Sequence, residues 1–242
     1  KEQLCEEDPK SAEILKPILR GRDMKRYGYQ WAGLWLINSH NNPPVQIDDY
    51  PAVKKHLDNY YPQLEKRLDK GQTPYNLRNC AYLQEFEKEK VVWAEMTNDS
   101  CFSWDDTGIL INQTGYFIPN ASKYLLCLLN SKAIYFYFSN IATELGNGAF
   151  RWIKQFVEQI PIPQISKTDQ QPLITLVDKL LAAKVRGEDT SVWERRIEAL
   201  VFDLYNLTEE EMLSILQDDK TVSEEERREI QFYFRQLQRA KT

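Results

Sequence analysis

Five cationic side chains lie within eleven residues near the start of this 242-residue chain. They are Lys16, Arg20, Arg22, Lys25 and Arg26. Burying such a segment would remove several charges from water, so we expect it to face the surface, pinned on one side by Ile18 and Leu19. Arginine and lysine at this density suit phosphate oxygens or base edges. The residues alone predict either an anchored basic loop that contacts such groups or a solvated loop with ordinary ion pairs.

Other residue patterns that could support catalysis are weak. Asn42-Pro43-Pro44-Val45 is close to the Asn-Pro-Pro-aromatic motif of amino-methylating enzymes, but Val45 cannot stack on a base, and we interpret the run as a turn. Asp23-x-Lys25 matches half of a metal-dependent nuclease site, without a second carboxylate placed to share the metal. We therefore expect no catalytic residues and no metal site in this piece.

Composition indicates a globular protein with a local binding patch. The net charge is −5, with 19 basic and 20 acidic residues in 1–165 and 12 basic and 16 acidic residues in 166–242. This balance disfavours indiscriminate binding to polyanions. The four cysteines, Cys5, Cys80, Cys101 and Cys127, have no metal-ligand spacing, and we expect free thiols in a cytoplasmic protein with no membrane partner. The missing initiator Met suggests a fragment of a longer protein.

The elements that must position the basic residues indicate an α+β fold. Aromatic and branched residues predict a strand over 29–38, and helical spacing predicts a helix from Tyr50 to Gly71 that Pro62 kinks or divides. Short strands follow over 91–96, 101–104, 108–112 and 115–118, then two apolar helices from Asn120 to Phe138.

The second part of the chain reads as helical. Ile160-Pro161-Ile162-Pro163 suggests a boundary, so we predict a small mixed β-sheet domain flanked by helices over 1–165 and an all-helical C-terminal segment over 166–242. Helices are expected over 173–185 and 193–205, with further ones opening at Thr208 and Ser223.

Several motifs, in order, resemble those of the TaqI-like C-terminal specificity domain. Leu15 to Tyr27 is similar to its Lys-Pro-x-Leu-Arg-Gly-(Arg/Lys)-Asp-Ile-Lys-Arg-Tyr opening, and Pro51 to Leu57 to its Tyr-Pro-Ala-Leu-Lys-x-His-Leu helix. The resemblance continues through 74–78, 86–92, 125–132, 150–163 and 197–211, where Glu198 stands at a position that is usually Asp.

This resemblance implies a target recognition domain of an adenine-specific DNA methyltransferase or type IIG restriction-modification enzyme. The fragment itself would not be an enzyme. The full-length protein would be a site-specific DNA methyltransferase, with or without endonuclease activity, whose N-terminal methyltransferase domain binds S-adenosylmethionine. The implied partners are double-stranded DNA, read through the major groove, and that N-terminal domain, into which the target adenine is flipped.

The resemblance also assigns roles to the cations. Lys16, Arg20, Arg22, Lys25 and Arg26 would contact phosphates or guanines, and a second group would assist them. That group is Arg78, Arg151, Trp152 and Lys154. Trp152 could equally belong to the core and Arg78 to an ion pair, whereas Asp23 is expected to orient a neighbouring arginine. We expect Arg22→Ala and Arg26→Ala to weaken duplex binding without unfolding the domain.

Two other functions remain open at the level of sequence. One is a protein-interaction or subunit-docking module, in which the acidic helical tail binds a partner as the helical spacers of type I specificity subunits do. The other is a self-contained enzyme, which the absence of a catalytic motif disfavours.

Overall fold

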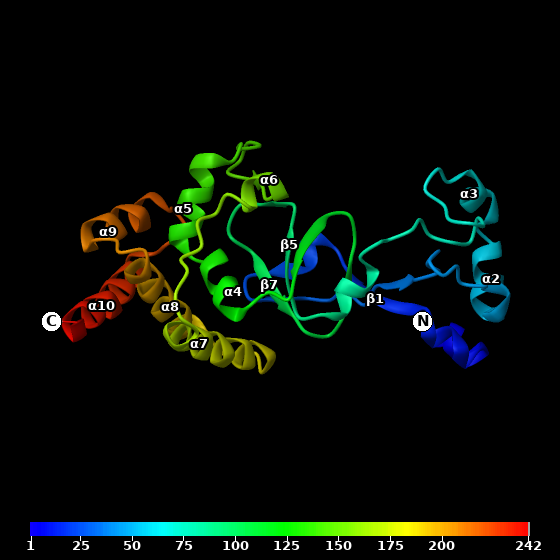
Figure 1. The fold of residues 1–242 in the computed structure, drawn as a ribbon, viewed down its shortest axis with the longest axis horizontal. Helices are drawn as coiled ribbons and strands as arrows, with labels where there is room; N and C mark the ends of the chain where they lie inside the picture. The colour runs from blue at the N-terminus through cyan, green and yellow to red at the C-terminus, as the bar shows by residue number, and fades with distance from the viewer. Residues whose placement is uncertain (242) are drawn as a thin grey trace. The chain divides into compact units, whose positions relative to one another are not determined.

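The computed structural model describes residues 1–241, which form two compact units. Unit 1 comprises 1–19, 31–88 and 107–112, and unit 2 comprises 20–30, 89–106 and 113–241. The predicted boundary after residue 165 does not coincide with this division, because helices beyond it share a hydrophobic core with the strands before it. The α+β class is as predicted (Figure 1).

Unit 1 is built on a three-stranded sheet in which β1 lies in the middle. β1 pairs antiparallel with β4 and parallel with β8. The elements of this unit are α1 (Glu2–Glu7), η1 (Pro9–Glu13), β1 (Leu15–Leu19), β4 (Trp35–Ile37), η3 (Ile47–Asp49), α2 (Pro51–Asp58), α3 (Tyr61–Lys66), η4 (Leu83–Glu87) and β8 (Leu110–Ile111), where η marks 3-10 helices. Ile14, Ile47 and Val53 form its small buried core.

Two predictions for this region are refined by the structure. The helix from Tyr50 is divided into α2 and α3, with Pro62 in the first turn of α3, where its missing N–H costs nothing. The strand predicted over 29–38 is interrupted: Gly33 adopts a φ of 71°, and the Trp31 indole N–H donates to the Leu34 carbonyl, so the chain turns before β4.

Unit 2 contains an antiparallel sheet ordered β7-β5-β9, two short antiparallel strand pairs and the helices. Its elements are η2 (Gly21–Asp23), β2 (Met24–Lys25), β3 (Gly28–Tyr29), β5 (Lys90–Ala94), β6 (Met96–Thr97), β7 (Phe102–Asp105), β9 (Gly115–Pro119), α4 (Lys123–Leu129), α5 (Lys132–Ile141), β10 (Phe150–Arg151), α6 (Lys154–Val157), α7 (Lys167–Val185), α8 (Ser191–Leu204), α9 (Glu209–Asp218) and α10 (Glu224–Lys241). β2 pairs with β3, and β10 with β6.

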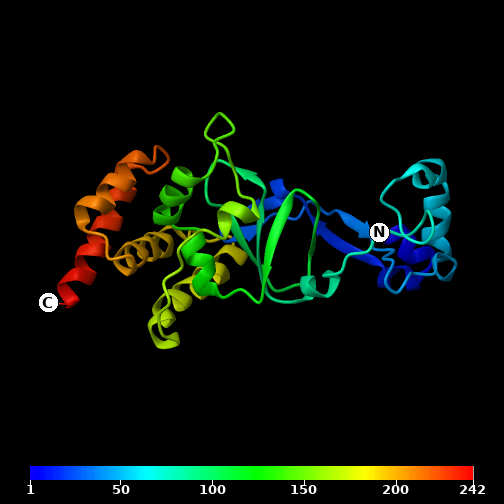
Figure 2. The same cartoon turned by 45° about the horizontal axis from the view of Figure 1, so that its top comes forward.

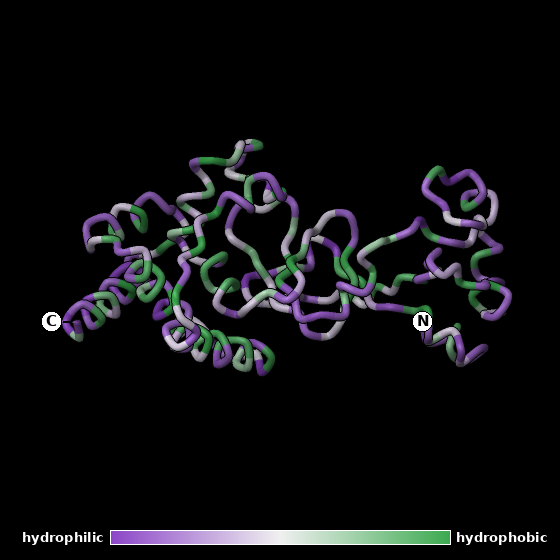
Figure 3. Tube along the Cα trace, viewed as in Figure 1, coloured by the Kyte–Doolittle hydropathy of each residue, from purple (hydrophilic) through white to green (hydrophobic). Residues whose placement is uncertain are grey.

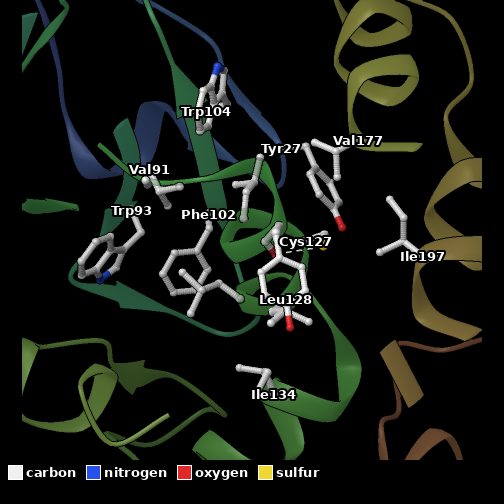
Figure 4. Packing of buried hydrophobic residues seen from close by; sticks show 14 of the residues in the cluster. Tyr27, Val91, Trp93, Phe102, Trp104, Cys127, Leu128, Ile134, Val177 and Ile197 are labelled. Carbon is white, nitrogen blue, oxygen red and sulfur yellow. Dashed lines mark hydrogen bonds between the residues drawn. The ribbon is translucent and has the colours of Figure 1, made fainter. Parts of the chain in front are cut away.

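The main core of unit 2 lies between the central sheet and the helices. Val91, Trp93 and Phe102 of the sheet belong to the same buried cluster as Val177 of α7 and Ile197 of α8 (Figure 4). Ser131 and Thr208 cap α5 and α9 as predicted, whereas α4 is capped by Ser122, two residues after the Asn120 expected from the sequence. No helix among residues 1–241 is long and apolar enough to span a membrane.

Because α7 and the central sheet share one core, we predict that they unfold cooperatively. Leu180 of α7 is fully buried, so Leu180→Ala should lower the free energy of unfolding by about 2–5 kcal/mol. Because the helix and sheet share one core, the tryptophan fluorescence and helical circular dichroism of unit 2 should shift to lower urea together. Val185→Ala, at an exposed position of the same helix, should change stability by less than about 0.5 kcal/mol. A variant in which only the helical signal shifts would contradict the shared core.

Candidate nucleic-acid interface

The basic segment of unit 2, Arg20 to Tyr29, is held against the central sheet by polar contacts. The Ser103 hydroxyl of β7 lies 2.7 Å from the Lys25 carbonyl oxygen and 2.6 Å from that of Gly28. The Tyr27 N–H donates to the Phe102 carbonyl over 2.8 Å. These bonds span both sides of the β2–β3 turn, so the segment has a fixed path over the sheet.

Asp23 fixes the first arginine of the segment, as expected from the sequence. Its carboxylate accepts from the Arg20 backbone N–H (2.8 Å), from Nε (3.1 Å) and from Nη2 (2.8 Å). The hydrogen bonds from Arg20 lower the pKa of Asp23, although its burial acts in the opposite direction. Arg20 therefore stabilises the conformation of this segment through its ion pair with Asp23.

Gly21 allows the segment to approach β9 closely. A Cβ at this position would lie 2.7 Å from the Thr114 carbonyl oxygen, closer than side-chain carbons approach. The Gly21 N–H donates to the Thr114 hydroxyl over 2.8 Å. The glycine in the middle of the cations is thus explained by close contact between two backbones.

Arg26 and Tyr27 form the turn between β2 and β3 and both point inward. The Arg26 side chain is 18% exposed, and its Nη2 donates to Glu198 of α8 over 2.6 Å, with Glu194 3.3 Å from Nε. Burial disfavours the charge on Arg26, but Glu198 and Glu194 outweigh it and raise the pKa of the guanidinium. Tyr27 is buried in the main core. Arg26 is consequently a structural ion-pair partner in this geometry, in contrast to the exposed contact expected from the sequence.

The ion pair continues into a network that the sequence analysis missed. The second Glu198 oxygen accepts from the Lys132 N–H over 2.9 Å, at the start of α5. The Lys132 ammonium lies 2.9 Å from Asp219 and 3.3 Å from Asp99. A sequence clue was present: Glu198 lies between Ile197 and Val201 on the apolar face of α8, where a carboxylate requires a buried partner.

Arg22 and Lys25 are the cations of this segment that point to solvent. Both are exposed, and neither forms an ion pair with any residue in the described part of the chain. The Lys25 ammonium donates to the Arg22 backbone carbonyl over 3.1 Å. Lys16 is also exposed, in β1 of unit 1.

Arg151 lies at the same end of β5 as the basic segment. Its Nε donates to Glu95 over 3.0 Å, and Glu95 follows Ala94, whose Cβ lies 3.2 Å from the Gly21 Cβ position. Arg151 follows a glycine-rich hairpin, 144–150, that stands out as a loop in Figure 2. The backbone next to Arg22 and the side chain of Arg151 therefore both lie near Ala94 and Glu95, although the sequence separates the two arginines by more than a hundred residues.

The remaining predicted residues occupy different environments. Lys154 is exposed at the start of α6, with Glu158 3.9 Å away. Trp152 is buried and stacks on Phe138 at a centroid distance of 3.6 Å, so it belongs to the core, the alternative that the sequence left open. Arg78 belongs to unit 1 and lies 3.5 Å from Asp69. No group of three or more metal-ligating side chains occurs within residues 1–241.

The chain is similar to known proteins along most of its length. Residues 16–162 match the family model described as the TaqI-like C-terminal specificity domain. The type II methyltransferase M.BstVI of Geobacillus stearothermophilus is 19% identical over 214 residues, which cover 85% of this chain and 36% of that protein. A solved structure of the type IIL restriction-modification enzyme MmeI in complex with DNA matches 98% of this chain and 32% of its own, with a TM-score of 0.58 and 16% identity. The chain thus spans about a third of the length of either relative.

The buried ion pair predicts that Arg26→Ala is destabilising. Removing the guanidinium leaves Glu198, 2% exposed, as an uncompensated buried charge, which should cost about 3–5 kcal/mol of unfolding free energy. Arg22→Ala removes an exposed arginine four residues away and should cost less than about 0.5 kcal/mol. Urea denaturation distinguishes the two, and Arg26→Met with Glu198→Leu should regain most of the loss. Equal stability of the two single variants would refute the role given to Glu198.

The Arg20–Asp23 pair predicts a specific pH dependence. Because the folded-state pKa of Asp23 lies below its ordinary value of 3.8, the carboxylate stabilises the fold above that value and the stabilisation is lost as the pH falls through the folded pKa. Asp23→Asn should therefore be less stable than the parent chain at pH 7, and the difference should shrink at pH 2–3. Urea titrations at several pH values measure this difference. A gap that is constant with pH would argue against the ion pair.

Proposed function

Because the chain belongs to the family of TaqI-like C-terminal specificity domains, we propose that it binds double-stranded DNA sequence-specifically and positions a target adenine for methylation by an N-terminal domain of the same polypeptide. The family match carries this proposal. The relatives support it, since one is a type II methyltransferase and the other is a restriction-modification enzyme whose structure is in complex with DNA.

The exposed cations of unit 2 suit the sequence-independent part of such binding. Arg22 and Lys25 have no carboxylate partner within the described residues, so phosphates need not displace an internal ion pair to reach them. Arg151 is half exposed, and a phosphate could replace Glu95 as its partner. Their common position at one end of β5 gives a local basic edge on a chain whose net charge is negative.

The proposal assigns duplex binding to this chain and methyl transfer to another domain, because an adenine inside a duplex is not accessible to the enzyme. A base in the stack is inaccessible to a methyltransferase, so it must be flipped out of the helix, at a cost of a few kcal/mol. A domain that holds the flanking duplex by its phosphates and base edges offsets part of that cost. In this proposal the present chain holds the duplex and the N-terminal domain carries out the methyl transfer.

Two features of this chain that could suggest S-adenosylmethionine binding do not fit that cofactor. Asn42-Pro43-Pro44-Val45 forms a turn closed by a bond from the Val45 N–H to the His40 carbonyl, and valine occupies the position of the aromatic residue. A cavity of about 640 Å³ between α7, α8 and α10 has no carboxylate in its lining to bind a ribose. We therefore assign the cofactor to the N-terminal domain and no transfer step to this chain.

Salt dependence of binding tests the proposal. The chain should bind a mixed-sequence duplex with an affinity that falls steeply with salt, and Arg22→Ala and Lys25→Ala should each reduce the slope of log K against log salt by about 1. Fluorescence anisotropy at 50–200 mM salt provides the measurement. Lys179→Ala, at an exposed position of α7, is the charge-matched control and should keep the parental slope.

Two outcomes would count against the proposal. No measurable binding to duplex DNA at low salt would remove it and leave a protein-interaction module as the better explanation. Binding with equal slopes for all four proteins would remove Arg22 and Lys25 from the interface.

A further inference from the structure

A long polar loop in unit 1 is held in place mainly by hydrogen bonds. Residues 67–82 connect α3 to η4 and contain no helix or strand, apart from an isolated bridge between Lys70 and Leu77. Connections of this length within a compact unit are uncommon and usually functional. Figure 3 colours much of this segment as hydrophilic, so burial of apolar side chains is not what orders it.

Asn76 is the centre of this loop. The residue is 1% exposed, and its Oδ1 accepts from the Thr73 N–H (3.2 Å) and hydroxyl (2.7 Å). Its Nδ2 donates to the carbonyls of Val45 (2.9 Å) and His40 (3.4 Å). A buried amide with every bond satisfied fixes its neighbours, so Asn76 joins loop 67–82 to the preceding loop, 39–46.

Further contacts fix both loops. Arg67 Nη2 donates to the carbonyls of Pro74 (3.0 Å) and Asn76 (2.9 Å), and the Ser39 hydroxyl donates to the Tyr75 carbonyl (2.6 Å). Asn41 Oδ1 accepts from the Gln72 N–H over 2.6 Å. A Cβ on Gly71 would lie 2.4 Å from that same oxygen, so only glycine allows the two loops to meet.

The hydrogen-bonded loops 39–46 and 67–82, here called the frame, expose several kinds of side chain, Lys70, Thr73 and Tyr82 among them. Four of the exposed side chains are amides or a guanidinium: Asn42, Gln72, Arg78 and Asn79, here called the amide surface. Asn79 Oδ1 accepts from Asn41 over 3.1 Å, and no acceptor within residues 1–241 takes the Asn79 amide protons. Arg78 and Asp69 are 3.5 Å apart, but the two side chains are 73% and 77% exposed, so the pair is weak and exchangeable.

We propose that the amide surface reads base edges of duplex DNA in the major groove. Asparagine and glutamine pair with adenine through two hydrogen bonds, and arginine pairs likewise with guanine, whereas a lysine-rich surface would hold phosphates without distinguishing bases. The amide surface has the residue types that distinguish bases. Discrimination also requires that these side chains be held on a rigid support, and the hydrogen bonds around Asn76 supply that support.

This inference rests on the proposed function and assigns a separate task to each unit. The cations of unit 2 bind phosphates of any sequence, and the amide surface of unit 1 selects the sequence. Substitutions in the two groups should therefore have different effects on affinity and on sequence preference.

Selection from a library of random duplexes, followed by sequencing, tests this assignment with the 242-residue chain. The parent should enrich a motif. Arg78→Ala, Gln72→Ala and Asn79→Ala should each flatten the preference at one or two positions by about tenfold, while affinity for unrelated duplexes stays within about twofold. Asn76→Ala should reduce the sequence preference at all the positions that these three residues read, because it removes the hydrogen bonds that hold loops 39–46 and 67–82 together.

Controls separate the two units and the two proposals. Lys66→Ala removes an exposed cation beside the loop and should leave the motif unchanged, and Arg22→Ala should weaken binding to all sequences alike. A motif that survives in all three surface variants, or a parent that binds duplex without any preference, overturns the assignment while DNA binding stands. A parent that binds no duplex overturns both. Circular dichroism confirms that each exposed variant is folded.

Discussion

The buried pair of Arg26 and Glu198 is the interaction on which the path of the basic segment of unit 2 depends. It joins a two-residue turn near the start of the chain to α8, more than 170 residues later. Two charges that leave water require close geometry and further polar contacts. The Lys132 N–H donates to Glu198, and the Glu194 carboxylate lies 3.3 Å from Arg26 Nε as a second ion-pair partner. With the turn held from inside, Arg22 and Lys25 remain exposed.

The fold handles its cations in two ways. Arg20 and Arg26 form ion pairs with carboxylates of the chain, whereas Arg22 and Lys25, which lie between them in the sequence, do not pair with any described carboxylate. Sequence spacing alone treats these four residues as one cluster. The structure shows that half of the cluster stabilises the protein and that the other half is available to a ligand. A basic cluster in a sequence therefore overstates the charge that a polyanion can reach.

Much of the architecture followed from local chemistry, since proline, the polar caps and alternating apolar residues mark boundaries without help from the rest of the fold. Ser122, Ser131 and Thr208 cap helices close to where the sequence predicts them, and Asp23 pairs with a neighbouring arginine because the two are three residues apart. What could not be predicted depends on contacts distant in sequence. The partner of Arg26, the burial of Trp152 against Phe138 and the role of Asn76 are all set by tertiary packing, and the predicted boundary after residue 165 missed the shared core for the same reason.

The path of the chain through the two units has a consequence for how specificity can change. Residues 31–88 form most of unit 1 and leave unit 2 and return to it at single points. Recombination could therefore exchange this stretch as one cassette with only two junctions. The incoming cassette would need to retain a strand able to pair with the edge of β1 that β4 now occupies. Under the proposed division of tasks, new recognition sequences could arise by grafting, while the exposed cations of unit 2 and its helical core would be inherited unchanged.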